Sequence, residues 1–291
     1  MDSMEVRIDD NSGFCFGVVR AIGEAEEALK RCGEVYSLGD IVHNRVEVQR
    51  LENLGLHAVT HADMPTLQDR TLLIRAHGEP PTTYRRAEEL GVKVIDATCP
   101  VVARLQRRLR EAYEKMQSVG GRVVLLGKRG HAEVIGLTGQ VADDVIVVEG
   151  FDDLALVDFT RPIYFLSQTT QSIDLFNRLA EEIRGRVTEG TEVTIDDTIC
   201  RRVAGREALL EEFSAGVDVV LFVAGRKSSN GRVLSEVCRR ANSRCYNIEE
   251  ASEIEPQWFE GAESVGICGA TSTPRWLMED VARAVEEMCN K

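Results

Sequence analysis

The apolar positions of the chain follow two patterns, one typical of helices and one typical of buried strands. After Cys15, apolar residues recur from Val18 to Leu29 at the spacing of one helix face, and Gly33 follows where such a helix would end. Short apolar runs that end in polar turns stand between the helical segments, as in TLLIRAHGEPP at residues 71–81. Strands that alternate with helices indicate parallel sheets in an α/β fold.

The same order of elements recurs three times along the sequence. Each third reads as a cysteine, a helix, a strand with a polar end, a second helix, a second strand with a polar end, and a third helix. We therefore predict three similar α/β lobes in a trefoil-like arrangement, over residues 13–98, 99–196 and 197–288. The pattern predicts helices over 16–31, 45–55, 82–91, 101–120, 134–140, 173–186, 234–240 and 276–288, with another directly after Cys200. It predicts strands, with their polar ends, over 34–44, 71–81, 93–99, 122–133, 145–148, 162–172, 192–200, 217–231, 244–248 and 264–274.

Cys15, Cys99 and Cys200 open the three repeats. They are too far apart in sequence for a local zinc finger, and we expect the lobes to bring them to one point. Thiolates from three segments suit a tetrahedral metal or an iron–sulfur cluster, in which a missing fourth cysteine leaves one position open. The alternative is that each cysteine is a small buried hydrophobic residue. Packing is the expected role of the other five cysteines: Cys32, Cys238, Cys245, Cys268 and Cys289.

Six polar loops follow the predicted strands, and ligands bind beyond the carboxyl ends of strands in parallel sheets. Three loops carry a histidine, and the last two carry hydroxyl and amide donors before a helix. Such residues bind phosphate at helix N-termini, cap the helix, or do both. The candidate anion-binding residues are His43, His77, His131, Ser228, Ser229, Asn230, Ser272 and Thr273.

Glu133 lies two residues after His131 and is a candidate proton donor. A carboxyl group enclosed in an anion-binding pocket has a raised pKa and can deliver a proton. Glu133 could instead only stabilise the start of a helix. Thr169 and Thr170 either relay that proton or cap the helix that follows them.

Composition limits the classes of protein that fit. The 291 residues are 43% hydrophobic and 29% charged, which is ordinary for a globular protein. A net charge of −13 argues against nucleic-acid binding. The polar N-terminus and the lack of a long apolar run predict no signal peptide and no membrane span, and eight cysteines without CxxC pairs fit a reducing cytoplasm. Neither GxxxxGK[ST] nor GxGxxG occurs, so nucleotide cofactors lack their fingerprint.

Nine short motifs, in this order, resemble those of the 4-hydroxy-3-methylbut-2-enyl diphosphate reductases, the last enzymes of the methylerythritol phosphate route to isoprenoids. They are SGFCFGVVRAI, GDIVHN, RAHGEPP, DATCPVV, GHAEV, SQTTQS, DTIC, KSSNG and GATSTPRWL. Each motif is weak alone, but the ordered set spans nearly the whole chain. The resemblance implies three lobes around one [4Fe–4S] cluster.

The resemblance also implies roles for the candidate residues. Cys15, Cys99 and Cys200 would hold the cluster, whose open iron would bind the allylic hydroxyl of the substrate. Glu133 would protonate that oxygen with the support of Thr169, and an external donor such as ferredoxin or flavodoxin would supply two electrons. The products would be isopentenyl and dimethylallyl diphosphate, made by a monomer or homodimer. The diphosphate would be held by His43, His77, Ser228, Asn230 and Ser272, with Ser229 beside them and His131 near the substrate hydroxyl.

One stretch departs from the family pattern. Val203 stands where a threonine is common and Glu207 where a glutamine is common, which puts the substrate contacts of that wall in doubt. Three alternatives therefore stay open. They are a related iron–sulfur enzyme acting on another hydroxylated anion, a non-catalytic cluster or anion sensor, and a zinc hydrolase.

Overall fold

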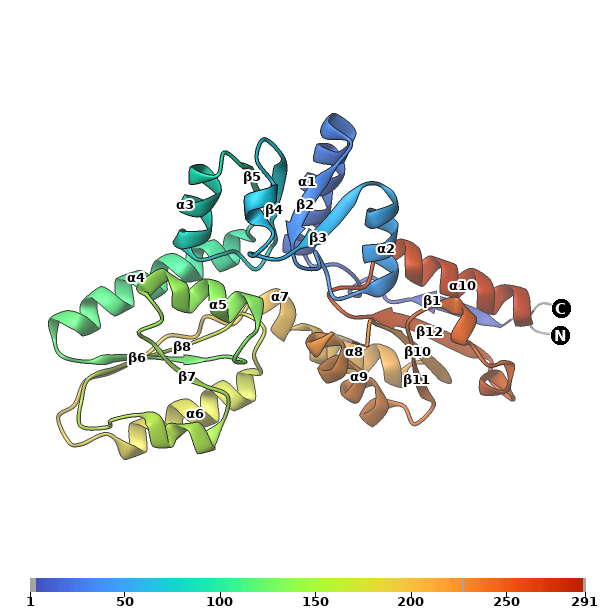
Figure 1. The fold of residues 1–291 in the computed structure, drawn as a ribbon. Coiled ribbons are helices and arrows are strands. Elements are labelled where there is room, and N and C mark those ends of the chain that lie inside the picture. Colours follow the sequence, from blue (N-terminus) through green and yellow to red (C-terminus); the bar gives the residue numbers. More distant parts are fainter. Residues whose placement is uncertain (1–3, 227, 290–291) are drawn as a thin grey trace. The chain divides into compact units, whose positions relative to one another are not determined.

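The structure is a computed structural model that describes residues 4–226 and 228–289, without the side chains of residues 203, 204 and 229. It contains three four-stranded sheets (Figure 1). We call them the N-terminal, middle and C-terminal sheets. Their strand orders are β3(Leu56–Val59)-β2(Val35–Leu38)-β4(Thr71–Ile74)-β5(Lys93–Asp96), β7(Ile146–Val148)-β6(Arg122–Leu126)-β8(Ile163–Ser167)-β9(Val193–Ile195), and β11(Cys245–Ile248)-β10(Val219–Val223)-β12(Ser264–Gly269)-β1(Glu5–Ile8).

The three sheets share one topology, and the first strand of the chain completes the last sheet. In each sheet the last two strands of the order pair in parallel: β4 with β5, β8 with β9, and β12 with β1. The chain runs from β5, β9 and β1 to a cysteine. Among the described residues no strand follows β12, and β1 takes the fourth place, with Glu5 opposite Ser264 and Ile8 opposite Ile267. The predicted class of three parallel-sheet α/β lobes is confirmed, and their trefoil arrangement stays a prediction.

Helices connect the strands, and short 3₁₀ helices lie in the connections. The helices are α1(Phe16–Cys32), α2(Arg45–Asn53), α3(Pro81–Glu89), α4(Pro100–Ser118), α5(Ala132–Thr138), α6(Ile173–Arg186), α7(Arg201–Ala204), α8(Arg206–Ala215), α9(Ser229–Ala241) and α10(Arg275–Cys289). The 3₁₀ helices span Met64–Thr66, Gly139–Val141, Phe151–Leu156, Ala251–Glu253 and Pro256–Phe259.

The predicted elements agree with the structure apart from the shortest ones. The prediction missed β1 and β3, because four-residue strands of mixed polarity give little periodic signal. The helix predicted directly after Cys200 is confirmed as α7, but the prediction did not separate it from α8, which begins after the intervening Gly205.

Strand β10 shows why these sheets are covered on both faces. All five of its residues are buried, and successive side chains point to opposite faces. Val219, Leu221 and Val223 pack in the same cluster as α10, whereas Val220 and Phe222 pack with residues of α8 and α9. Figure 1 shows α10 on one side of this sheet and α8 and α9 on the other.

The chain forms two compact units. The first comprises the described residues of 1–34, 40–57 and 205–291, and the second those of 35–39 and 58–204. The C-terminal sheet, α1 and α2 belong to the first unit, and the middle sheet belongs to the second. The boundaries predicted for three lobes stay a prediction.

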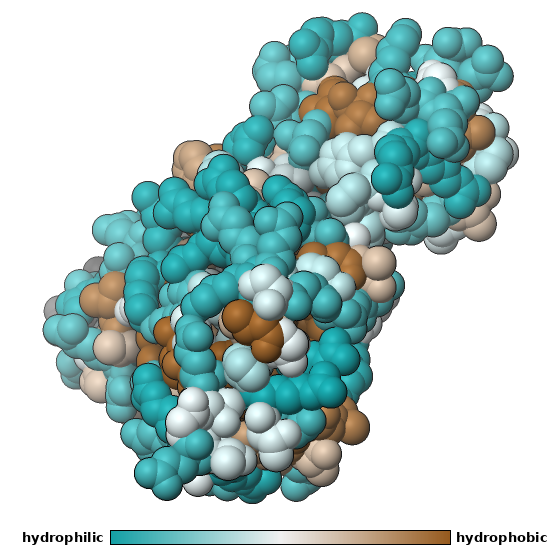
Figure 2. Space-filling view, turned by 90° about the vertical axis from the view of Figure 1, so that its left-hand side faces the viewer, coloured by the Kyte–Doolittle hydropathy of each residue, from teal (hydrophilic) through white to brown (hydrophobic). Residues whose placement is uncertain are grey.

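The exposed surface agrees with the charged composition. On the face in Figure 2, hydrophobic residues form small groups among hydrophilic ones. Among the helices of residues 4–226 and 228–289, none has the length and apolar content that crossing a membrane requires.

Candidate active site

The candidate loops and cysteines occupy equivalent positions in the three sheets. The six polar loops follow β2, β4, β6, β8, β10 and β12, which are the two central strands of each sheet. Cys15, Cys99 and Cys200 follow the edge strands β1, β5 and β9. Because strands in a parallel sheet end at one edge, each sheet presents two polar loops and one cysteine together. That the three groups meet at one point stays a prediction.

An aspartate holds each turn that leads to a cysteine. Asp9 accepts hydrogen bonds from the backbone N–H of Asn11 at 3.0 Å and from the Ser12 hydroxyl at 2.6 Å. Asp96 accepts from the backbone N–H of Thr98 at 2.9 Å and from its hydroxyl. These side chain to backbone bonds fix the turn before the cysteine.

The third turn is held both by its own aspartate and by neighbouring elements. Asp197 Oδ1 accepts from the Ile199 N–H at 3.1 Å. Asp196 accepts from Arg108 of α4 at 2.6 Å and from the Tyr164 hydroxyl of β8 at 2.9 Å. The Thr198 hydroxyl donates to the Ser167 carbonyl and accepts from the Ser167 N–H, which attaches this turn to the end of β8.

The three cysteines share a local environment. Each is half-buried and in no disulfide bond, and each directly precedes the first residue of a helix: α1, α4 or α7. Their backbone N–H groups donate to neighbouring loops, that of Cys99 to Ala76 at 3.0 Å and that of Cys200 to Thr169 at 2.8 Å. A helix N-terminus carries a partial positive charge, so these positions favour an anionic group.

In the second unit, Glu133 and Thr169 form a buried pair. Glu133 is 2% exposed in the first turn of α5, and its two carboxylate oxygens accept from the Thr169 N–H at 2.7 Å and the Thr169 hydroxyl at 2.9 Å. Burial raises the pKa of Glu133 to about 7, against the lowering effect of both hydrogen bonds. The group can therefore donate a proton near neutral pH. Thr169 does not cap α6, because Ser172 does.

His131 lies beside this pair with a defined neutral tautomer. It caps α5, and its Nδ1 atom accepts from the Glu133 N–H at 3.2 Å. The side-chain amide nitrogen of Gln168 lies 3.1 Å from the same Nδ1 atom. Two N–H donors on Nδ1 place the ring proton on Nε2. The His77 ring lies edge-on to the His131 ring, with centroids 5.3 Å apart.

Sequence reasoning missed Gln168, which fixes this geometry. It is 2% exposed, and its Oε1 atom accepts from the Lys128 N–H at 3.1 Å while its amide also contacts the Thr170 hydroxyl at 3.0 Å. Its position in the polar SQTTQS loop was the sequence feature that could have indicated a role in the site. A glutamine, however, carries no charge that marks it as functional.

In the first unit, the loops after β10 and β12 are joined by polar side chains. Ser228 caps α9 by accepting from the Gly231 N–H at 2.9 Å, and the Ser272 hydroxyl donates to the Ser228 hydroxyl at 3.2 Å. Asn230 Oδ1 accepts from the Thr271 N–H at 3.1 Å and its hydroxyl at 3.0 Å. The Ser229 side chain lies outside the described part.

These loops also contact the approach to Cys15 and the loop of His43. The Thr271 carbonyl accepts from the Cys15 N–H at 3.4 Å. Gly225 packs so tightly on the His43 loop that a Cβ atom there would lie 2.4 Å from the His43 carbonyl oxygen. The first unit thus gathers Cys15, His43, Ser228, Asn230 and Ser272. Thr273, by contrast, donates to the Val223 carbonyl at 2.6 Å and is fully buried, so its hydroxyl holds the loop.

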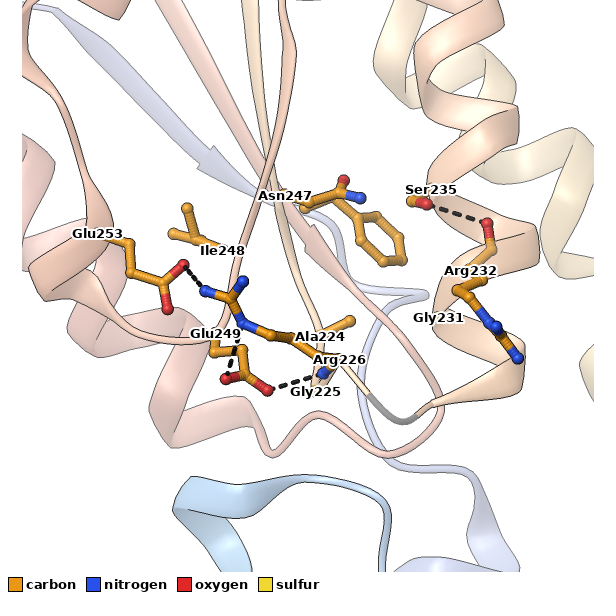
Figure 3. A pocket seen from close by; sticks show the side chains of 11 residues that line it. Ala224, Gly225, Arg226, Gly231, Arg232, Ser235, Asn247, Ile248, Glu249 and Glu253 are labelled. Atoms are coloured by element: carbon orange, nitrogen blue, oxygen red, sulfur yellow. Dashed lines mark hydrogen bonds and ion pairs between the residues drawn. The ribbon is translucent and has the colours of Figure 1, made fainter.

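Two surface pockets flank this loop. One of about 310 Å³ is lined by His43, Asn44, Arg45 and residues near Gly225. The other, of about 250 Å³, is shown in Figure 3, where Arg226 lies between Glu249 and Glu253. Arg226 Nη2 lies 3.2 Å from Glu253, and the Arg226 N–H donates to Glu249 at 2.7 Å. This cation is already neutralised by two carboxylates, so Arg226 is a poor partner for an anion in the second pocket.

The remaining sequence predictions have mixed outcomes. Core packing is confirmed for Cys238, Cys245 and Cys268, which are buried, and Cys289 packs partly. It is wrong for Cys32, which is exposed in the last turn of α1. Of the two family departures, Val203 falls among the undescribed side chains, and Glu207 lies half-buried in the first turn of α8.

Fold and site together define an α/β protein in which each parallel sheet carries a thiol and polar loops at one edge, and in which the middle sheet also carries a buried acid. The chain belongs to the LytB family, whose model, described as LytB protein, matches residues 6–286.

Named relatives agree with this assignment. The chain is 51% identical over 285 residues to the 4-hydroxy-3-methylbut-2-enyl diphosphate reductase of Parabacteroides distasonis, covering 98% of each chain. It is 46% identical to the enzyme of the same name from Bacteroides fragilis, covering 97% of this chain and 98% of the relative.

Solved structures are similar as well. One is of (E)-4-hydroxy-3-methyl-but-2-enyl diphosphate reductase, the terminal enzyme of the non-mevalonate pathway. It has a TM-score of 0.76 and 36% identity, covering 98% of this chain and 99% of that chain. A Plasmodium falciparum reductase structure, with a TM-score of 0.82 and 24% identity, covers 97% of this chain and 87% of that one and shows the same fold. The chain is therefore an enzyme of a reductase family.

Proposed function

We propose that this chain reduces 4-hydroxy-3-methylbut-2-enyl diphosphate to isopentenyl and dimethylallyl diphosphate. The allylic carbon–oxygen bond breaks, two electrons and two protons are consumed, and water leaves. The observation that carries the proposal is the buried Glu133, held by Thr169 with a pKa of about 7. A carboxyl group in this state can protonate a departing hydroxyl group and then regain its proton.

The proposed cofactor is one [4Fe–4S] cluster held by Cys15, Cys99 and Cys200. The donor set fits: the three thiols are half-buried and in no disulfide bond, and each lies at a helix start that favours an anionic ligand. When bound, the cluster would supply electrons one at a time and, at the iron without a cysteine, a Lewis acid for the hydroxyl oxygen. Protein residues would then bind, orient and protonate.

The proposed diphosphate ligands are His43, His77, Ser228, Asn230 and Ser272, with Ser229 beside them. Ser228 caps α9 and also contacts Ser272, so its hydroxyl belongs to a pre-formed group of donors at a helix N-terminus. His131 would present Nε2–H to the substrate, because its Nδ1 atom accepts from Glu133 and Gln168.

The proposed electron source is a separate carrier protein such as a ferredoxin or flavodoxin. The reaction consumes two electrons, and the sequence has neither nucleotide-binding fingerprint considered above. A cytoplasmic location is part of the proposal, because none of the eight cysteines is in a disulfide bond and a reducing compartment keeps thiols reduced.

Anaerobic purification followed by turnover tests the proposal. We expect about four irons and four sulfides per chain with a broad visible absorption band. Turnover of the hydroxylated diphosphate with dithionite and methyl viologen should yield both isomers. Stoichiometric zinc without colour would contradict the cluster. A cluster without turnover would favour a sensor, and turnover of a different hydroxylated anion alone would favour a related enzyme.

A cysteine exchange tests the ligand assignment. Cys99→Ser should lose cluster iron, whereas Cys32→Ser, which changes an exposed thiol in the last turn of α1, should keep it. An intact cluster in the Cys99→Ser protein would contradict the ligand set.

A further inference from the structure

A pocket beside Cys200 is lined by arginines, although the chain as a whole is acidic. The pocket measures about 330 Å³, and we call it the arginine pocket. Helix α4 contributes Arg104 and Arg108, and the start of α7 contributes Arg201 and Arg202. Its other lining residues are Val101, Leu105, Asp197, Thr198, Ile199 and Cys200. All of them belong to the second unit.

The charge of this pocket contrasts with that of the chain. Four arginines line it against the carboxylate of Asp197 and that of Asp196, which pairs with Arg108, whereas the net charge of the protein is −13. Local fields of this kind steer an oppositely charged partner to one place on the surface. The pocket therefore suits an acidic partner that the remainder of the surface repels.

The four arginines differ in how firmly they are held. Arg108 is fixed by its 2.6 Å contact with the buried carboxylate of Asp196, and Arg201 contacts Asp197 at 2.6 Å. Arg104 is exposed, and among the described residues no ion pair involves it. Arg104 therefore keeps its charge available for a partner.

The lining of the pocket also includes apolar side chains and a cysteine. Val101, Leu105 and Ile199 line it together with Cys200. An apolar centre with a charged rim is the usual anatomy of an interface between proteins, and redox partners use small examples of it. A redox centre bound through Cys200 would be adjacent to whatever occupies the pocket.

We infer that the arginine pocket is the docking surface for an acidic one-electron carrier protein. The inference rests on the proposed function, because that reaction needs two external electrons and the proposed cluster is held in part by Cys200. It goes further by naming the surface where the carrier binds and the charges that select it.

Charge reversal tests the docking surface in the cluster-loaded full chain. We expect Arg104→Glu with Arg202→Glu to weaken the binding of an acidic ferredoxin or flavodoxin about tenfold, measured by calorimetry at low salt. The wild-type affinity should fall as salt is raised, and the variant should lose most of this dependence. Turnover driven by the carrier should decline, while turnover driven by dithionite and methyl viologen should stay at the wild-type level.

Arg107→Glu is the matched control, because Arg107 is an exposed arginine of the same helix that does not line the pocket. Equal weakening by this control, unchanged carrier binding in the double variant, or no carrier binding by the wild type would each overturn the inference. Absence of viologen-driven turnover in the wild type would contradict the proposed function instead, and the calorimetry would still decide whether the carrier docks here. Circular dichroism and the unfolding midpoint verify that the variants fold.

Discussion

The backbone N–H and the hydroxyl of Thr169 both donate to the carboxylate of Glu133, one to each oxygen. The acid lies at the start of α5 and the threonine follows β8, so two loops of the middle sheet meet at this contact. The carboxyl group is buried, and each of its two oxygens accepts one hydrogen bond from Thr169. This arrangement makes several properties of the protein testable.

Glu133→Gln should keep the cluster and lose turnover by at least about 100-fold, the usual contribution of general acid catalysis. Glutamine preserves the shape of the side chain but cannot donate a carboxyl proton. Steady-state turnover with dithionite and methyl viologen measures the loss. Glu189→Gln, which alters an exposed carboxylate of the second unit, is the control and should be neutral. Wild-type turnover by the Glu133 variant would show that another group is the acid.

Burial of Glu133 should also make stability depend on pH. Its pKa is raised from 4.5 to about 7 on folding, so the stability it contributes is fully present below pH 4.5 and is lost as the pH rises towards 7. Relative to Glu133→Gln, the free energy of unfolding of the wild type should fall by about 2–3 kcal/mol between pH 5 and pH 8. Urea unfolding of both proteins across this range measures the difference. A constant difference would mean that the carboxyl pKa is ordinary.

Thr169→Val should weaken catalysis by removing one donor to the Glu133 carboxylate. A lost hydrogen bond of about 1–2 kcal/mol corresponds to roughly tenfold in turnover. Because that bond lowers the pKa of Glu133, its loss should raise the pKa further. The alkaline limb of the pH–turnover profile should then move to higher pH. Thr169→Ser keeps the hydroxyl and should restore both properties. A profile that does not move in Thr169→Val would assign the threonine a purely structural role.

Gly225→Ala should displace the loop of His43. The added Cβ atom would lie 2.4 Å from the His43 carbonyl oxygen and 3.0 Å from the Asn44 Cα atom. These are backbone atoms, so the loop itself must move to relieve the overlap. We expect a higher KM for the diphosphate substrate with a smaller change in kcat. Gly185→Ala is the control: it lies in α6 with nothing within 4 Å of its Cβ position, and it should bind substrate normally. Equal KM values for both variants would separate Gly225 from substrate binding.

Much of the fold could be predicted because long apolar periodicities are local. Helix α1 follows from the spacing of Val18 to Leu29, and buried strands such as β10 follow from continuous apolar runs. Strands β1 and β3 were missed because four residues of mixed polarity give little periodic signal, and pairing with a neighbouring strand decides their conformation. The pairing of β1 with β12 joins opposite ends of the chain, which no local pattern reports.

The residues of the candidate site likewise differ in whether the sequence alone could identify them. Cys15, Cys99, Cys200 and Glu133 were visible because few side chains ligate metals or deliver protons. Gln168 was not, because its role comes from a contact with His131 on another loop. The sequence also left two roles open for Thr169, as a helix cap or as a partner of the acid. The structure decides for the second role, because Ser172 caps α6 and Thr169 donates to Glu133.

By itself the sequence determined the three repeats, the cysteine that opens each of them and the polar loops, since residue type and spacing are properties of the chain. Only the tertiary structure decided that those loops follow the central strands and the cysteines the edge strands. It also decided that Glu133 is buried and that four arginines surround one pocket with Cys200. Burial, pKa and local charge depend on atoms brought together from distant segments, and that proximity exists only once the chain has folded.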